Sequence, residues 1–308
     1  MKYLFFDIEC SNCFGGIGKM CEFGYVIVDE TFKVIKKDGL IMSPGKGREN
    51  RFDTGIYKRE PGFQWAYEFE YYYSCEEFPN FYNKIKSLMT DDVKVMGFAV
   101  DNDIRYLLET CERYKLDLFD FKAYETQKLM DRYLPEERRK RGLQNVFKEV
   151  CGIDEYVRMQ GHYSRDDAIM TMRIIEEICK LNNCSLEELL EKTPDSKYDA
   201  LDYYEHYKGN KDLKKNRKIN GETWKKLVSE NTNEGDKYVI TGLVKQDNDI
   251  FNKICEFVNS HNLSISNKID ESKYLVCLDE SDAEKMKEVL KTPFEGTYIT
   301  ARQLFEER

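Results

Sequence analysis

Long apolar runs are missing from this 308-residue sequence, and its start has neither the basic nor the hydrophobic segment that is typical of a secretory signal. A transmembrane helix needs about 20 predominantly apolar residues, and no stretch of the chain comes near that length. The 41% content of hydrophobic residues is that of a globular protein. We therefore expect a cytoplasmic protein that is neither secreted nor inserted in a membrane.

An excess of positive charge is also missing. The chain has 48 Lys and Arg residues against 57 Asp and Glu residues, which gives a formal net charge of -9. The molecule as a whole therefore offers no electrostatic attraction to nucleic acids. Any binding of a phosphate backbone must come from local basic patches or from bound metal cations.

A disulfide framework is the third missing feature, because the ten cysteines are scattered and several lie inside apolar patterns. This distribution indicates reduced thiols. Cys10 and Cys13 form a Cys-x-x-Cys pair with Cys21 nearby. A zinc site is the less favoured interpretation, because no fourth ligand has a suitable spacing.

The patterns that are present divide the chain into an α/β domain over residues 1–183, a polar and partly helical linker over residues 184–235, and a small α/β domain over residues 236–308. The linker is acidic in its first half and basic in its second half. The basic half is compatible with a solvated face or with a strip that contacts phosphates.

Within the first domain, an antiparallel meander is predicted to come first and helices to alternate with strands after it. Strands are predicted at 4–6, 22–28, 34–42, 93–100 and 119–124. Helices are predicted at 78–89, 103–114, 144–150 and 168–181. The stretch between 44 and 78 holds alternating aromatic residues that are compatible with a strand, a helix face or core packing. Such a sheet predicts functional groups at strand ends.

Two carboxylates stand at the end of the first strand. Asp7 and Glu9 are one residue apart in Tyr3-Leu-Phe-Phe-Asp-Ile-Glu9, and strand pleating points alternate side chains to the same face. Carboxylates this close repel each other and resist losing water, so the arrangement suggests a cation between them. The alternative is that both acids belong to a solvated loop.

Three later residues are candidates for the same site. Asp103 opens a helix directly after a buried strand, which places it at the same edge of the sheet. His162 and Asp167 are five residues apart and cannot stack on one helical face. We expect His162 on the loop before the helix, folded back, while Asp167 projects from the first turn. Alternatively, Ser164 to Asp167 form an N-terminal capping box.

In this order, the acids and the histidine resemble the DEDDh exonuclease superfamily, typified by the proofreading epsilon subunit of bacterial replicative DNA polymerase. The resemblance covers about residues 1–181 and rests on Phe5-Phe-Asp-Ile-Glu9, Cys21-Glu-Phe-Gly24, Asp103-Ile-Arg-Tyr-Leu107 and Gly161-His-Tyr-Ser-Arg-Asp-Asp-Ala168. The chain departs from the family at Cys10, where threonine or serine is common. It also has Gly97-Phe-Ala where Gly-His-Asn is common, which leaves Asp101 as an alternative to Asp103.

The resemblance implies a ribonuclease H-like fold and a two-metal 3′ to 5′ exonuclease that acts on single-stranded DNA or RNA ends, with DNA favoured. Two Mg²⁺ or Mn²⁺ ions would be held by Asp7, Glu9, Asp103 and Asp167. His162 would take the proton from the attacking water. Candidates for stacking on the terminal bases are Ile8, Phe14, Trp65 and Tyr71. The alternatives are a catalytically silent adaptor, which has no need of mutually repelling acids, and an RNA-processing exoribonuclease.

Residues 236–308 resemble a BRCT domain. The resemblance rests on Tyr238-Val-Ile-Thr-Gly242, the helix after Asp249, Lys273-Tyr-Leu-Val-Cys277 and Lys285. The usual glycine pair after the first helix is replaced by Ser260-His-Asn262, and the tryptophan of the final helix by Leu304 or Phe305. The resemblance implies a phosphate held by Thr241, Gly242 and Lys285, and a replicative polymerase or a phosphorylated protein as partner. Alternatively, Thr241 and Gly242 only end a strand, and Lys285 is solvated.

Overall fold

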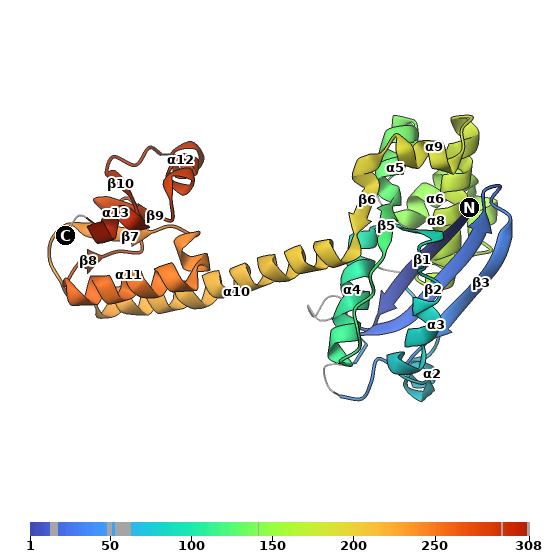
Figure 1. Ribbon diagram of the computed structural model, residues 1–308, viewed down its shortest axis with the longest axis horizontal. Helices are drawn as coiled ribbons and strands as arrows, with labels where there is room; N and C mark the ends of the chain where they lie inside the picture. Colours follow the sequence, from blue (N-terminus) through green and yellow to red (C-terminus); the bar gives the residue numbers. More distant parts are fainter. Residues whose placement is uncertain (13–17, 48–50, 53–62, 141, 291, 307–308) are drawn as a thin grey trace. The chain divides into compact units, whose positions relative to one another are not determined.

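The computed structural model describes residues 1–12, 18–47, 51–52, 63–140, 142–290 and 292–306. The chain forms two compact units, residues 1–205 and residues 206–308 (Figure 1). No disulfide links the cysteines within these described ranges. None of the helices in the described part of the chain is both long enough and apolar enough to cross a bilayer.

The first unit contains a six-stranded mixed sheet with the strand order β3-β2-β1-β4-β5-β6. The predicted meander is present, and its strands are β1 (Lys2–Cys10), β2 (Met20–Asp29) and β3 (Val34–Ile41). The other half of the sheet consists of β4 (Val93–Gly97), β5 (Lys122–Glu125) and β6 (Lys197–Asp199). Because β1, β4 and β5 run parallel, their carboxyl ends meet at one edge of the sheet.

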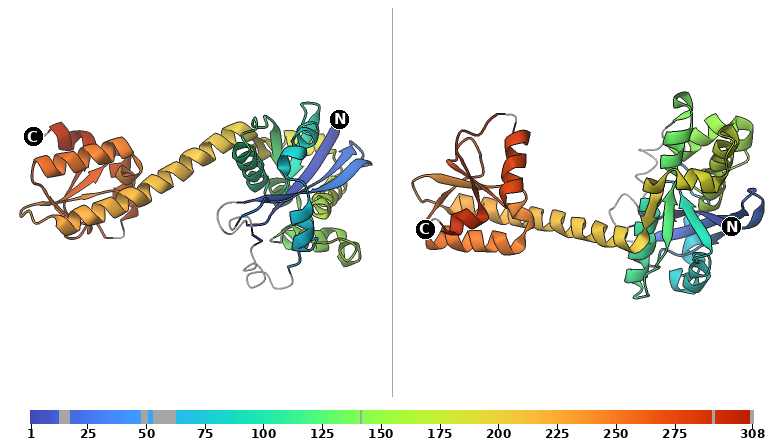
Figure 2. Two further views of the ribbon diagram at one scale, coloured as in Figure 1. Left: turned by 90° about the horizontal axis from the view of Figure 1, so that it is seen from below. Right: turned by 45° about the horizontal axis from the view of Figure 1, so that its top comes forward.

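Helices flank this sheet, as predicted for an α/β fold (Figures 1 and 2). Tyr3 and Phe5 of β1 share one core with a group of four helices. These helices are α5 (Thr126–Tyr133), α6 (Leu143–Cys151), α8 (Ser164–Leu181) and α9 (Leu186–Glu191). The alternate residues of the strand, Leu4 and Phe6, are equally buried. α4 (Val100–Arg113) packs against β1, β2 and β4.

The region between β3 and β4 differs from the prediction. In place of one helix over residues 78–89, a 3-10 turn that begins with Phe78 and Pro79 precedes a short helix. The elements here are α2 (Phe69–Ser74), η3 (Phe78–Asn80) and α3 (Tyr82–Lys86). Three further short elements of the first unit are η4 (Glu136–Arg138), α7 (Ile153–Tyr156) and η5 (Pro194–Ser196).

The segment predicted as a polar, partly helical linker contains helices and a strand. Its strand β6 pairs with β5 and completes the sheet of the first unit. A single long helix, α10 (Ala200–Glu230), follows. Tyr204 at its start donates a hydrogen bond to Glu112 in the first unit, at 2.9 Å. Trp224 near its end is fully buried in the core of the second unit, where its Nε1 donates to the carbonyl oxygen of Ser266.

The second unit has a four-stranded parallel sheet with the order β10-β9-β7-β8. Its strands are β7 (Lys237–Ile240), β8 (Ser264–Ile265), β9 (Tyr274–Cys277) and β10 (Thr297–Thr300). Its other elements are η6 (Val244–Gln246), α11 (Asn248–Ser260), α12 (Glu280–Val289) and α13 (Ala301–Glu306). β8 has only two residues, which are too few for a strand to be recognised from alternation.

Candidate active site

The candidate site begins at the carboxyl end of β1. Asp7 is opposite Gly24 of β2, Glu9 is opposite Glu22, and the pairing becomes irregular directly after Glu9. Asp103 lies in the first turn of α4, the helix that follows the parallel strand β4, and only 5% of it is exposed. Asp103 lies near enough to the backbone amide of Ile8 and to Asp7 for both groups to affect its pKa. The predicted meeting of these acids at one sheet edge is therefore present.

His162 and Asp167 come from the start of α8. His162 has a left-handed backbone conformation with φ of 60°, which folds the loop back toward the helix. Its backbone amide donates to Asp167 Oδ2 at 3.0 Å, and its Nδ1 lies 3.7 Å from Glu9 Oε1. One ligand atom from each of Glu9, His162 and Asp167 lies within 4.8 Å of the others. The structure thus joins the late histidine and aspartate to the first strand.

The motif around Gly24 explains how α8 comes so close to the sheet. A Cβ atom at Gly24 would lie 2.0 Å from the backbone nitrogen of Arg165, so only glycine leaves room for the start of the helix. Glu22 accepts hydrogen bonds from the amide and the hydroxyl of Ser164, at 3.1 Å and 3.0 Å, and from the hydroxyl of Tyr72. The Ser164 hydroxyl is therefore used by Glu22, and this contact replaces the capping box considered from the sequence.

Glu125 is a second carboxylate whose role the sequence did not reveal. It ends β5, and its two oxygens accept hydrogen bonds from the backbone amides of Ala99, Val100 and Gln127. The first two amides belong to the left-handed turn that starts α4, and the third opens α5. Glu125 thus holds the helix start that carries Asp103. No short-range motif signals this role, because its partners at Ala99 and Val100 come from the neighbouring strand connection.

The electrostatics of the site are those of carboxylates held together away from water. Burial, followed by the charge of Asp7, raises the pKa of Asp103 well above its usual value. Burial and then Asp7 also raise the pKa of Asp167, against a lowering effect of His162. Among the residues that the structure describes, Asp103 Oδ2 and Asp167 Oδ1 are buried with no hydrogen-bond partner. Buried oxygens of this kind are the ligands that hard divalent cations take, so the residues fit Mg²⁺ or Mn²⁺.

Asp101 and Asp103 make different contacts, and these contacts indicate which of the two acids belongs to the site. Asp101 accepts a hydrogen bond from the hydroxyl of Tyr203 on α10, at 3.4 Å. The pKa of Asp103 is raised by the charges of Asp7 and Glu9, so Asp103 is the acid that lies near them. This placement favours Asp103 as the third acidic member of the site.

The predicted base-stacking residues have different environments. The ring of Phe63 lies 4.5 Å from the ring of His162 and 5.0 Å from that of Trp65, so Trp65 reaches the histidine through Phe63. Tyr71 on α2 is 48% exposed and packs against Tyr67. Ile8 is only 6% exposed, which leaves little surface for a base. Phe14 lies outside the described residues.

In the second unit, the predicted phosphate-binding residues Thr241 and Gly242 follow β7. Thr241 is 3% exposed, and its Oγ1 donates to Asp282 Oδ2 at 2.6 Å. The guanidinium of Arg217 lies against Gly242, where a Cβ atom would be 2.9 Å from Nη2. Lys285 is exposed on α12. A carboxylate therefore takes the threonine hydroxyl that the resemblance assigns to a phosphate.

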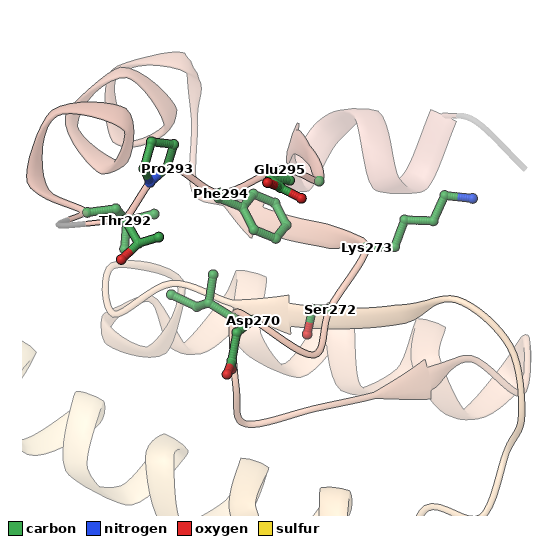
Figure 3. Close-up of a pocket in the computed structure, with 10 residues that line it drawn as sticks. Asp270, Ser272, Lys273, Thr292, Pro293, Phe294 and Glu295 are labelled. Carbon is green, nitrogen blue, oxygen red and sulfur yellow. The ribbon is translucent and has the colours of Figure 1, made fainter.

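A cavity of about 720 Å³ also lies in the second unit, beside the segments 269–273 and 292–296 and Leu290 (Figure 3). Its lining includes the ring of Phe294, which packs edge-on against Tyr298. Lys273 at its rim pairs with Asp236 at 2.6 Å. None of the residues that line it belongs to the carboxylate site.

Comparisons with known proteins identify structures but no sequence relatives. No family model matches the chain, and no curated protein matches it. Exonuclease I, in a structure described as suggesting how processivity is achieved, is similar with a TM-score of 0.50 and 13% identity, covering 62% of this chain and 42% of that one. E. coli exonuclease I with a dA16 oligonucleotide has a TM-score of 0.48, 14% identity and the same two coverages. The nuclease domain of 3'hExo, a DEDDh family member bound to rAMP, has a TM-score of 0.45, 14% identity and coverages of 59% and 92%.

The similarity to exonuclease I confirms the coarser part of the predicted fold, a mixed α/β arrangement with helices on a central sheet. The chain spans less than half of the exonuclease I chain. At this low identity the similarity concerns the fold alone, and the activity has to be argued from the site.

Proposed function

We propose that the first unit is a metal-dependent 3′ to 5′ exonuclease that hydrolyses phosphodiester bonds at single-stranded ends, with DNA favoured. The observation that supports this most strongly is the meeting of acids from β1, α4 and α8 beside one histidine. Folding pushes these charges together against repulsion and loss of water. A divalent cation would remove that cost.

The residues have distinct roles in the proposed reaction. Asp7, Glu9, Asp103 and Asp167 would hold two Mg²⁺ or Mn²⁺ ions, which when bound stabilise charge on the phosphate and supply a water of lowered pKa. His162 would accept the proton of the attacking water. The hydrogen bond from the backbone amide of His162 to Asp167 holds the loop, and the approach of Nδ1 to Glu9 would orient the ring with Nε2 as the accepting atom.

Two other carboxylates would act as positioning residues. Glu22 holds the start of α8 through Ser164, three residues before Asp167. Glu125 holds the start of α4 through the amides of Ala99 and Val100. Both helices therefore present their aspartates from backbone that is fixed by hydrogen bonds, which limits the reorganisation needed during reaction.

The end of the strand would be held by aromatic stacking. Trp65 is half-buried and connected to His162 through Phe63, and Tyr71 is exposed. Stacking of a base on an aromatic ring contributes about 1–3 kcal/mol. Trp65→Ala and Tyr71→Ala should therefore weaken binding of a single-stranded oligonucleotide. Unchanged binding and unchanged activity in both variants would exclude this assignment.

Release of nucleotides from end-labelled single-stranded DNA and RNA, with Mg²⁺ or Mn²⁺ and with chelator, tests the activity. Asp7→Asn should abolish release, whereas Asp101→Asn, an equal change on the first turn of α4, should retain it. Comparison of DNA with RNA identifies the preferred substrate. Binding without hydrolysis by the unaltered protein would instead indicate an adaptor, and activity that survives Asp7→Asn would contradict the mechanism.

For the second unit, we propose the BRCT-like identity that the sequence suggested, with a replicative polymerase or a phosphorylated protein as partner. The buried contact between Thr241 and Asp282 does not add support for a phosphate at this point. Titration of the full chain with a phosphopeptide, with Lys285→Ala as the comparison, tests the proposal. Equal binding by the two proteins, or no binding, would remove the phosphate site.

A further inference from the structure

Positively charged side chains gather around a second cavity of the second unit, with a volume of about 370 Å³. We call this cavity the cationic groove. Its basic residues are Lys214, Arg217, Lys218 and Lys225 of α10 and Lys245 of η6. Gly221 and Glu222 also line it. All of these residues belong to the second unit.

The groove has a defined geometry because α10 is anchored beside it. Positions 214, 218, 221 and 225 follow one another at intervals of three and four residues, so they form a stripe along one side of the helix. Asn220 donates to the carbonyl oxygen of Lys245 at 3.0 Å and to Asn248 Oδ1 at 2.8 Å. The burial of Trp224 fixes the same stretch of helix on the core. The stripe is therefore held in a fixed position beside η6.

The charges of the groove are poorly balanced by nearby acids. Glu222 is the one acid among its lining residues. Within the described residues, none of the five cations forms an ion pair with a carboxylate. Lys245 is half-buried, and burial together with Arg217 and Lys225 lowers its pKa. Like charges held together in this way favour a bound anion, by the same reasoning that applies with opposite sign to the carboxylate site.

The two units also differ in net charge. The second unit has as many Lys and Arg residues as Asp and Glu residues, so the first unit carries the whole formal charge of -9. Between residues 208 and 226, eight basic residues stand against two acidic ones. The molecule that lacks an overall attraction to nucleic acids therefore has one local basic surface on α10.

We propose that the cationic groove binds the phosphodiester backbone of a single-stranded nucleic acid, the substrate class of the proposed exonuclease, on which this inference rests. The stripe from Lys214 to Lys225 is roughly 16 Å long at 1.5 Å per helical residue. That length suits a row of phosphates better than a single phosphate group. Grooves of this kind follow the backbone without reading the bases, and their binding depends strongly on salt.

The test is fluorescence anisotropy of a labelled single-stranded oligonucleotide with the full chain, in chelator so that no hydrolysis occurs. K218Q/K225Q removes two charges from the groove. K215Q/K226Q removes two charges from exposed positions of the same helix that do not line it. The groove variant should weaken binding at low salt and reduce the slope of log K against log salt by about 1.4, which is about 0.7 per lost phosphate contact. The control variant should keep the slope of the unaltered protein.

If K218Q/K225Q folds poorly, a second pair of variants at Gly221 provides the test. A Cβ atom at Gly221 would meet open space, so this helical position accepts a side chain. Gly221→Asp places a carboxylate in the groove and should weaken binding, whereas Gly221→Ala should not. Equal binding by groove and control variants overturns the inference, as does groove-dependent binding of a phosphopeptide or of phosphatidylserine vesicles in place of the oligonucleotide. Nucleotide release by the unaltered protein is measured in a separate assay. A failure of the proposed exonuclease activity can therefore be distinguished from a failure of the proposed binding by the groove.

Discussion

The two charge clusters of this protein differ in sign, in burial and in the way the backbone holds them. The acids at the end of β1 are joined by Asp103 and Asp167, which are each 5% exposed, and a backbone amide donates to Asp167. The basic residues of the cationic groove are mostly exposed and extend from one helix. Buried charges interact strongly and are little screened, while exposed charges interact weakly and are screened by salt. We therefore expect large effects from changes at the acids and graded, salt-dependent effects from changes at the groove.

The largest expected effect is that of Asp103→Asn on nucleotide release. Loss of one carboxylate that would hold the metal ions should weaken the charge stabilisation that these ions supply and reduce the rate by about 10²–10³-fold or more. Asp101→Asn, two positions earlier on α4, should stay within a few-fold of the unaltered protein, because Asp101 bonds to Tyr203 instead. Equal losses in the two variants would show that the site has been assigned to the wrong acid.

A bound metal ion should stabilise the first unit. Without the metal, the repulsion among the carboxylates of the site should lower the free energy of unfolding. At a concentration of 100 times Kd, a bound ion adds about 2.7 kcal/mol to the free energy of unfolding. Thermal unfolding with Mg²⁺ or Mn²⁺ and with chelator measures this difference. Asp103→Asn should reduce the metal effect and should raise the melting temperature in chelator, because it removes a buried charge. A metal-free variant that is less stable than the unaltered protein would contradict this account.

The pH dependence of the metal-free protein has a definite sign. The pKa values of Asp103 and Asp167 are raised by folding, so the folded state retains protons that the unfolded state releases above about pH 3.9. Stability without metal should therefore fall as pH rises from about 3.9 toward the raised values. The same titration with Mg²⁺ should show a smaller fall, because the cation favours the charged acids. Denaturant unfolding at a series of pH values measures both curves.

An intermediate effect is expected at Glu22, which joins β2 to the start of α8. Glu22→Ala leaves the buried groups of Ser164 and Tyr72 without their acceptor, and each lost partner costs about 1–3 kcal/mol. Activity should fall as well, because Asp167 and His162 lie on this turn. Glu22→Gln keeps an acceptor oxygen and should lose less stability. If the two variants lost stability equally, the hydrogen bonds would not be the cause.

The smallest expected effect is that of a single change in the groove. Lys225→Gln should weaken oligonucleotide binding a few-fold at low salt, and the difference should shrink as salt screens the exposed charge. Asp103→Asn should show no comparable recovery of nucleotide release with salt, because its neighbourhood is buried. Anisotropy and release assays over the same range of salt make this comparison directly.

Much of the local structure was predictable because it depends on neighbouring residues. The meander, the helices that carry Asp103 and Asp167 and the folded-back His162 follow from alternation and spacing, and the structure contains them. The segment predicted as a polar, partly helical linker contains α10, but its polar composition did not indicate that the end of this helix is packed in a core. Trp224 was the signal within it, as a large apolar residue that needs a core.

By itself the sequence determined which acids stand at strand ends, since the two-residue period of a strand places Asp7 and Glu9 on one face. Only the tertiary structure decided which other groups join or support them. Glu22 reaches Ser164 across 142 positions of the chain, and Glu125 reaches Val100 across 25. Likewise, Lys245 lies at the basic stripe of α10, where Asn220 donates to its carbonyl oxygen across 25 positions of the chain. Such contacts depend on packing between distant segments, so they cannot be predicted from the spacing of residues in the sequence.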